Sequence, residues 1–299
     1  MVPDDRSSGS AAIPGRAPPA PGWQGKIKRQ KAGRRYKRGY PNGGEAPEIR
    51  QETDHARFLH EAKKNEAMER IKILIVVTGT GRYPHGKLPT GLWFSELIHI
   101  YDSAQKRGYE PVIASPEGGD TPIDPVSLQP IYLDRLSRSY RDDTGFRETL
   151  RQTKSLEEAT GQLFDCIYLA GGHGAMFDFP DNSALKTLVR EHYEHRRTVA
   201  AICHGVCGLL NVKLSDGRHL IAGKKLTGFS WFEEGLARRK KAVPFDLEAA
   251  LKARGADYRK ALIPMTPEVV TDGNLITGQD PFSSARMAKT VMRHFDKHE

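Results

Sequence analysis

Residues 198–210 read TVAAICHGVCGLL, and the pattern of this stretch indicates the fold class. Residues 198–202 form a short apolar run that is typical of a buried strand. Cys203, His204 and Gly205 then interrupt this run where the chain must turn, and a helix-like apolar pattern follows. A buried strand that turns sharply into a helix is the repeating unit of an α/β sheet covered on both faces.

The same alternation of short apolar runs and helical patterns continues on both sides of this stretch. The predicted strands cover residues 71–78, 109–115, 164–172 and 198–202. The predicted helices cover about residues 91–107, 147–159 and 182–196. Near the end of the chain the sequence predicts a hairpin with Asp272-Gly273 at its turn, followed by a closing helix. Strands that alternate with helices indicate βαβ units, so we expect a doubly wound, mostly parallel α/β sheet of the flavodoxin-like type.

The N-terminal segment differs from the rest of the chain in composition. The full chain carries a formal net charge of +9, and residues 1–44 contribute +8 of it. Pro, Gly, Ser and basic residues dominate here, and they cannot bury enough apolar surface to offset the entropy of ordering. We therefore predict a disordered basic tail over residues 1–53 and one α/β domain over residues 54–299, which begins with a short helix. The basic cluster at residues 26–38 suits weak nucleic-acid binding, and a solvated linker is the alternative.

The cysteine content indicates a reducing compartment. Cys166, Cys203 and Cys207 are too few and too closely placed for a disulfide framework. No apolar run approaches the roughly 18 residues of a membrane span, and the N-terminus lacks the apolar core of a signal peptide. We expect a cytoplasmic protein that does not associate with membranes.

Three unusual stretches follow predicted strands, at the edge of the sheet where such folds place their ligand crevice. They are AGGHGAMFDFP at residues 170–180, the turn at residues 203–205, and KLPTGLWFSEL at residues 87–97. The last places Glu96 in the first predicted helix. We expect these stretches to form the functional site together.

Cys203 is the candidate nucleophile of this site. A tight strand-to-helix turn holds it out of the core, and a helix N-terminus beneath it stabilises a thiolate by about 0.3 to 2 kcal/mol. Gly205 leaves room at the start of the helix, as glycine does in the nucleophile elbow of hydrolases. The N–H of His204 and one from Gly171 or Gly172 would form an oxyanion site.

A structural cysteine and a metal site are the alternatives. Most cytosolic cysteines are small buried hydrophobes, and we favour that interpretation for Cys207. A metal site would combine Cys203, Cys207, His204 and His173, but adjacent residues do not easily ligate one tetrahedral ion. The chain also lacks a phosphate-binding loop of the G-x-x-x-x-G-K-[ST] kind. We expect neither a metal nor a cofactor.

Six ordered motifs resemble the DJ-1/PfpI superfamily. They are TGLWFSEL, YLAGGHGAMFDFPD, AAICHGVCGLL, LTGFSWFEEGL, VPFDLEAALKARGA and TDGNLITGQDPFSS, and the similarity covers about residues 71–296. Within the superfamily they are most similar to the Hsp31-like branch, whose members act as glutathione-independent glyoxalases and have been called chaperones or deglycases. The resemblance implies a cofactor-free enzyme that acts on small 2-oxoaldehydes, and we expect a homodimer.

The resemblance also implies roles for individual residues. Cys203 matches the nucleophilic cysteine of the family, His204 the adjacent histidine and Glu96 the carboxylate beside the thiol. Glu234 falls where the branch places the acid that orients the histidine, although Glu233 is an alternative.

Departures from the family's motifs concern the substrate. Gly172, with the histidine, would supply the amides of the oxyanion site. Val206 and Cys207 replace the proline and small residue often found after Cys-His-Gly. Trp231 and Phe232 make the segment before the acid bulkier than expected. These changes leave the size and identity of the substrate open.

The chemistry of a thiol beside a carboxyl supports an acid–base role for Glu96. Two anions in contact in a low dielectric repel each other, so the pair should share one proton. Cys203 then reacts as a thiolate while Glu96 donates a hydrogen bond and later moves protons. The leading hypothesis is the conversion of methylglyoxal to lactate through a hemithioacetal, an enediolate and a thioester on Cys203.

Other activities of the same cysteine remain open. Class I glutamine amidotransferases place their nucleophile in G-x-C-x-G-x-Q and use a distant His-Pro-Glu, and this chain has neither pattern. A peptidase or deglycase would use the same site. A stress-holding chaperone or redox sensor is the non-enzymatic alternative, with Cys203 as the oxidised thiol.

Overall fold

A computed structural model describes residues 70–84 and 88–296 of the chain. The predicted basic tail and the short helix near residue 54 lie outside the described residues, so the boundary at residue 54 stays a prediction. Within the described part, no helix is long and apolar enough to cross a membrane.

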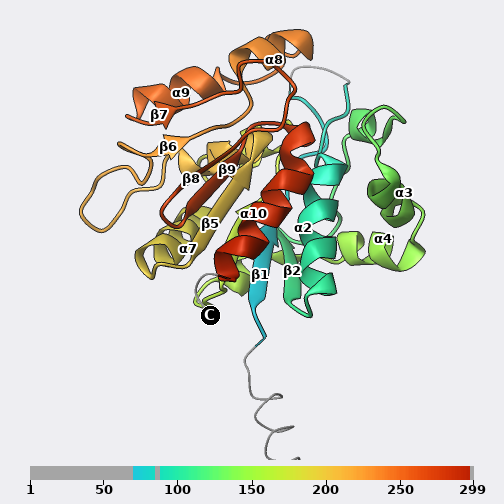
Figure 1. Ribbon diagram of the computed structural model, residues 1–299. Helices are drawn as coiled ribbons and strands as arrows, with labels where there is room; N and C mark the ends of the chain where they lie inside the picture. Colours follow the sequence, from blue (N-terminus) through green and yellow to red (C-terminus); the bar gives the residue numbers. More distant parts are fainter. Residues whose placement is uncertain (1–69, 85–87, 297–299) are drawn as a thin grey trace, which may run out of the picture. The chain divides into compact units, whose positions relative to one another are not determined.

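A seven-stranded sheet with the order β3-β2-β1-β4-β5-β9-β8 forms the centre of the fold (Figure 1). Its strands are β1 (Lys72–Val76), β2 (Glu110–Ser115), β3 (Lys154–Ser155), β4 (Cys166–Leu169), β5 (Thr198–Ile202), β8 (Val269–Asp272) and β9 (Leu275–Gly278). All neighbours are parallel except β8 and β9, which form the predicted hairpin. A separate parallel pair joins β6 (Lys225–Leu226) to β7 (Asp257–Tyr258).

Helices cover both faces of this sheet. They are α2 (Phe94–Lys106), α3 (Arg135–Arg141), α4 (Thr144–Arg151), α5 (Leu156–Ala159), α6 (Ala175–Asp178), α7 (Ser183–Glu194), α8 (Trp231–Leu236), α9 (Leu247–Ala253) and α10 (Ser284–Phe295). Three 3-10 helices are η1 (Pro125–Leu128), η2 (Cys203–Leu209) and η3 (Pro281–Ser283). Figure 1 shows α2 and α10 side by side on one face, with α7 on the other.

The two helical layers explain why the strands are apolar throughout. Along β1, Ile73 and Ile75 pack into the core beneath α2 and α10, whereas Leu74 and Val76 pack into the core beneath α7. Successive side chains of a strand point to opposite faces, so a sheet covered on both faces needs apolar residues at every position. The doubly wound fold predicted from the sequence is confirmed.

The helix predicted over residues 147–159 is wrong, because it is two helices with a strand between them. The side chain of Asp143 caps α4, and Ser155 begins α5 with a capping box to Glu158. Between them the Thr153 N–H donates to the Gly119 carbonyl at 3.1 Å, and β3 then pairs with β2. Hydrogen bonds to the sheet edge therefore replace those of a continuous helix.

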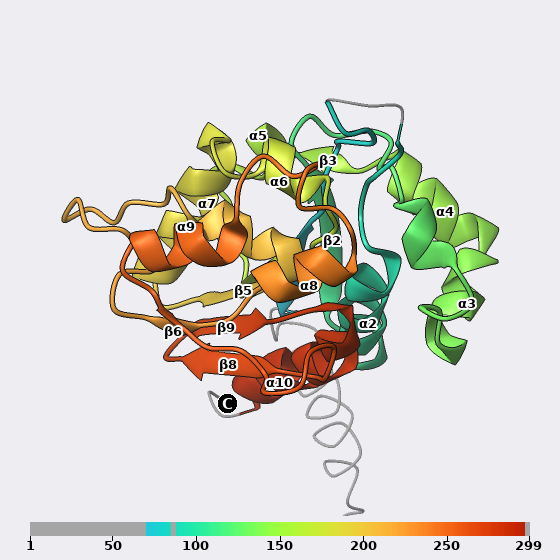
Figure 2. The same cartoon turned by 90° about the horizontal axis from the view of Figure 1, so that it is seen from above.

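The site lies where the parallel strands end. Helix α8 lies above this edge, next to the end of β5 (Figures 1 and 2), and its Glu234 reaches His204. The hairpin turn after β8 falls at Gly273-Asn274, one residue later than predicted, and Gly273 has a φ of +63°.

Candidate active site

Cys203 occupies a strained turn directly after β5. Its φ is +57°, in the left-handed region that residues other than glycine rarely adopt. Gly205 is needed two residues later, because a Cβ there would lie 2.5 Å from the Leu169 carbonyl oxygen. The sequence predicted an α-helix after the cysteine, and the structure instead has the 3-10 helix η2. The turn orients the thiol, but it does not place it at the N-terminus of an α-helix.

Cys203, His204 and Glu234 form a continuous chain of contacts. Cys203 Sγ lies 3.3 Å from His204 Nδ1, and His204 Nε2 lies 2.8 Å from Glu234 Oε2. All three residues are buried. Burial acts to raise the pKa of Glu234, but His204 and His173 outweigh it and hold that pKa well below its usual range. An ionised Glu234 can accept a hydrogen bond from the imidazole of His204.

The two candidate acids on α8 have different partners. Glu233 Oε2 accepts hydrogen bonds from the N–H and hydroxyl of Ser230 in a capping box, and its Oε1 accepts one from Gln279 at 2.8 Å. Both carboxylate oxygens of Glu233 therefore accept hydrogen bonds away from the histidine, and Glu234 is the acid that contacts His204.

His173, named above only as a possible metal ligand, is a second contact of Glu234. Its Nε2 lies 2.9 Å from Glu234 Oε1, and its ring centroid lies 4.1 Å from that of His204. Burial and the neighbouring His204 lower the pKa of His173. Its position directly after Gly172, in a loop expected to face the ligand, was the available signal.

One carboxylate and two imidazoles could also ligate a metal ion. The donor atoms of His173, His204 and Glu234 all lie within 4.8 Å of one another. The alternative set with Cys207 does not form, because the Cys207 thiol donates to the Ala175 carbonyl at 3.2 Å and lies in the core beneath α7.

Glu96 lies on the other side of the thiol. It is fully buried, its Oε2 accepts a hydrogen bond from the Gly171 N–H at 2.7 Å, and it is within hydrogen-bonding reach of Cys203. Burial raises the pKa of this carboxyl well above its usual range. A Cβ on Gly171 would lie 2.7 Å from Glu96 Oε2 and 2.9 Å from the Cβ of Cys203, so only glycine permits this contact.

The oxyanion site expected from Gly171, Gly172 and His204 needs a correction. The Gly171 N–H is already bonded to Glu96, so it is not available to a substrate oxygen. Gly172, at a φ of +103°, has no acceptor for its N–H among residues 70–84 and 88–296. The amides of Gly172 and His204 remain the candidate pair.

The pKa of the Cys203 thiol depends on whether Glu96 is protonated. Burial and the charge of an ionised Glu96 raise the pKa of Cys203, whereas the His204 N–H lowers it. If Glu96 carries the proton, its charge no longer opposes the thiolate. Burial and the neighbouring Glu96, rather than a helix dipole, are therefore the main influences on the pKa of Cys203.

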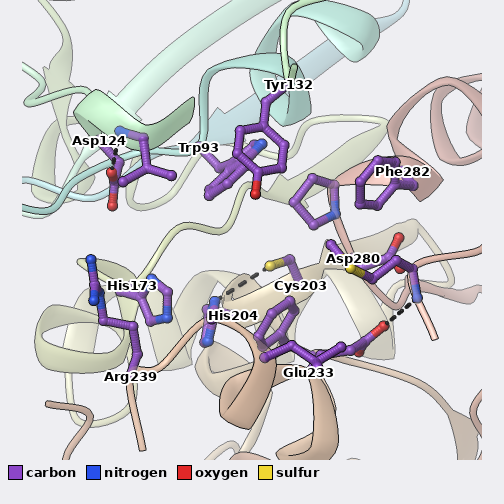
Figure 3. A pocket seen from close by; sticks show the side chains of 16 residues that line it. Trp93, Asp124, Tyr132, His173, Cys203, His204, Glu233, Arg239, Asp280 and Phe282 are labelled. Carbon is purple, nitrogen blue, oxygen red and sulfur yellow. Dashed lines mark hydrogen bonds between the residues drawn. The ribbon is translucent and has the colours of Figure 1, made fainter. Parts of the chain in front are cut away.

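Cys203 and His204 line a cavity of about 300 Å³ (Figure 3). Aromatic rings form much of its wall, contributed by Trp93, Tyr132, Phe229 and Phe282. In Figure 3, His173, Asp124 and Arg239 lie toward one end of the cavity and Asp280 toward the other. A small aldehyde in this cavity would reach the thiol.

Comparison with known proteins identifies the family. The model of the DJ-1/PfpI family matches residues 94–294, a range that includes the thiol, both candidate acids and the glycine-rich loop. The chain belongs to the DJ-1/PfpI family. The resemblance noted in the sequence motifs is confirmed.

Within the DJ-1/PfpI family the similar proteins include named glyoxalases. Glutathione-independent glyoxalase hsp3101 of Schizosaccharomyces pombe is 31% identical, over 71% of this chain and 89% of that protein. The crystal structure of glyoxalase III from Candida albicans has a TM-score of 0.68 and 28% identity, over 75% of this chain and 96% of that one. The 24 kDa rapid encystment protein of Francisella tularensis has a TM-score of 0.71 and 35% identity, over 75% and 98%.

Proposed function

We propose that this protein converts methylglyoxal and similar 2-oxoaldehydes to 2-hydroxy acids without glutathione. The observation that carries the proposal is the position of Cys203 between a buried Glu96 and a His204 held by Glu234. Glu96 can thus exchange a proton on one side of the thiol, and His204 can act as a base on the other. The glyoxalase names of the similar proteins support this activity for the chain.

The first step is addition of the thiolate to the aldehyde. Cys203 Sγ bonds to the aldehyde carbon, and the carbonyl oxygen takes the proton of Glu96 to give a neutral hemithioacetal. The N–H groups of Gly172 and His204 hold this oxygen while its charge develops. Glu96 is left as a buried carboxylate beside the new thioether.

The second step moves a proton between the two substrate carbons. Glu96 takes the proton from the former aldehyde carbon, which gives an enediolate, and returns it to the neighbouring carbon, while the hydroxyl proton passes from the oxygen of the first carbon to the oxygen of the second. Glu96 Oε1, which has no hydrogen-bond partner in the described chain, is the oxygen available for this transfer. The product is a thioester of the 2-hydroxy acid, with one carbon oxidised and the other reduced, so no external electron carrier takes part.

The last step is hydrolysis of the thioester. His204 takes a proton from water, which attacks the thioester carbon, and the imidazolium is stabilised by Glu234. The thiolate leaves, and the proton that His204 took from water passes to Glu96, which restores its neutral form. The overall reaction adds one water to methylglyoxal to give lactic acid.

A single pair of assays tests the enzyme against the chaperone alternative. We expect lactate release from methylglyoxal, lost in Cys203→Ala. Suppression of client aggregation that survives Cys203→Ala, with no lactate from the unmodified protein, would overturn the proposal.

We also propose a reducing compartment such as the cytoplasm, and a homodimer. Three free cysteines support the compartment. Analytical ultracentrifugation tests the dimer.

Weak nucleic-acid binding through the basic segment before residue 54 is a separate proposal, tested by its loss at high salt.

A further inference from the structure

The cavity is larger than a three-carbon substrate requires. Its volume is about 300 Å³, and four aromatic rings line it beyond the thiol. Methylglyoxal has one methyl group to place in that space. A substrate that fills the cavity would carry a larger group on its ketone carbon.

Arg239 is a charged lining residue that the glyoxalase mechanism does not use. Its guanidinium lies over the ring of Tyr83, 6.0 Å from the centroid, and it forms no ion pair with a carboxylate in the described part of the chain. The nearby Asp124 accepts hydrogen bonds from the Val126 N–H and the Thr90 hydroxyl, and it attracts Arg239 by charge without forming an ion pair or a hydrogen bond with it. Partly buried arginines usually have an anionic partner, so this guanidinium is available to a ligand.

The end of α8 fixes the position of Arg239. Arg238 has a φ of +57°, and its N–H donates to the Gly235 carbonyl at 3.1 Å, while the Arg239 N–H donates to the Glu234 carbonyl at 3.1 Å. This is the helix ending in which glycine normally takes the left-handed position. The chain tolerates an arginine there, and the turn ties Arg239 to the backbone of Glu234, which holds His204.

We propose that Arg239 binds an anionic group, a carboxylate or a phosphate, on the larger part of a 2-oxoaldehyde whose aldehyde carbon meets Cys203. This inference rests on the proposed function. The planar guanidinium binds either anion through two hydrogen bonds.

The test compares two aryl substrates that differ in charge. Initial rates are measured for 4-carboxyphenylglyoxal and for phenylglyoxal, before the arylglyoxals modify arginines. We expect Arg239→Leu to lower the ratio of kcat/KM, carboxylated over neutral, by roughly 10- to 100-fold, the usual loss of a hydrogen bond to a charged group. The ratio for Arg239→Lys should lie between those of the unmodified protein and Arg239→Leu, because lysine keeps the charge but lacks the planar pair of donors.

Arg238→Gly is the matched control. It removes a positive charge from the same turn and suits the left-handed backbone, so the substrate ratio should stay within about twofold of the unmodified protein. A carboxylate is distinguished from a phosphate by inhibition of phenylglyoxal turnover with acetate and with inorganic phosphate. The stronger inhibitor identifies the anion, and Arg239→Leu should weaken its inhibition.

Two results would overturn the inference. If Arg239→Leu lowers kcat/KM for both substrates by the same factor, Arg239 has only a structural role. If Arg239→Leu leaves kcat/KM unchanged for both substrates, the subsite is excluded. If the unmodified protein converts neither of these substrates nor methylglyoxal, the proposed function fails instead. The subsite is then judged by calorimetry with phosphate and acetate, where absence of binding that depends on Arg239 would overturn it.

Discussion

At the scale of single residues, a substitution of Glu96 can distinguish its role in proton transfer from its effect on the reactivity of Cys203. Glu96→Gln keeps the shape and a hydrogen-bond donor but cannot give up a proton. We expect turnover of methylglyoxal to fall by roughly 10² or more, the usual contribution of general acid–base catalysis. Alkylation of Cys203 at a fixed pH, followed by peptide mapping, should change by only a few-fold. Near-normal turnover of Glu96→Gln would remove Glu96 from the mechanism.

The same substitution predicts a pH-dependent change in stability. Burial raises the pKa of Glu96 above its ordinary value of 4.5, so its neutral form is favoured in the folded protein. Its contribution to stability is full below about pH 4.5 and is lost progressively as the pH rises toward the folded pKa. Glutamine does not ionise, so Glu96→Gln should melt at a higher temperature than the unmodified protein at pH 8, with the difference vanishing near pH 4. A difference that does not vary with pH would contradict this prediction.

The candidate catalytic residues could be predicted from the sequence better than their environment. Cys203, His204 and Glu96 each fall in a distinct motif, and the structure brings them together. The amide of Gly171 was assigned to the oxyanion because the sequence does not show that Glu96 accepts from it at 2.7 Å. Such an assignment depends on the packing of α2 against the loop after β4, which pattern and spacing do not specify.

At the scale of elements, the start of α8 connects helix capping to the site. Ser230 and Glu233 form its capping box, and the next residue is Glu234. The Ser-x-x-Glu spacing was visible in the sequence and would have assigned Glu233 to the cap and left Glu234 for the histidine. The two acids stayed unresolved because the start of this six-residue helix was not predicted.

Ser230→Ala tests this connection. Loss of a capping residue costs about 0.5 to 2 kcal/mol of stability, so the midpoint of chemical denaturation should fall. We expect kcat for methylglyoxal to fall as well, because a loosened α8 no longer holds Glu234 against His204. Ser155→Ala removes the equivalent cap from α5, away from the site, and should lower stability without a matching loss of kcat. Equal effects on kcat in the two variants would contradict the connection.

At the scale of the whole molecule, the parallel sheet was predictable and the small additions to it were not. Strands such as β4 and β5 are continuous apolar runs because helices cover both of their faces. The strands β3, β6 and β7 have two residues each, which is too short to show a period of their own. Long-range contacts, rather than local pattern, determine such segments.

Removal of the N-terminal segment tests the predicted division of the chain. Every strand of the sheet and every candidate catalytic residue lies between Lys72 and Phe295. We expect a protein lacking residues 1–50 to keep its kcat/KM for methylglyoxal and its melting temperature within a few degrees. A fall of many degrees would show that the segment contributes to the fold, and the boundary at residue 54 would be wrong.

The arrangement of the three cysteines determines how the protein would respond to peroxide. Cys203 and Cys207 belong to core layers on opposite faces of the sheet, and Cys166 begins β4, at the far end of the strand from the turn that carries Cys203. A sulfenic acid on Cys203 therefore has no second thiol of the chain with which to form a disulfide. Recovery would depend on a small external thiol entering the cavity, and without one the oxidation proceeds to the sulfinic acid. For a protein of this architecture, the supply of a small external thiol, rather than a second cysteine of the chain, determines whether oxidation is reversible.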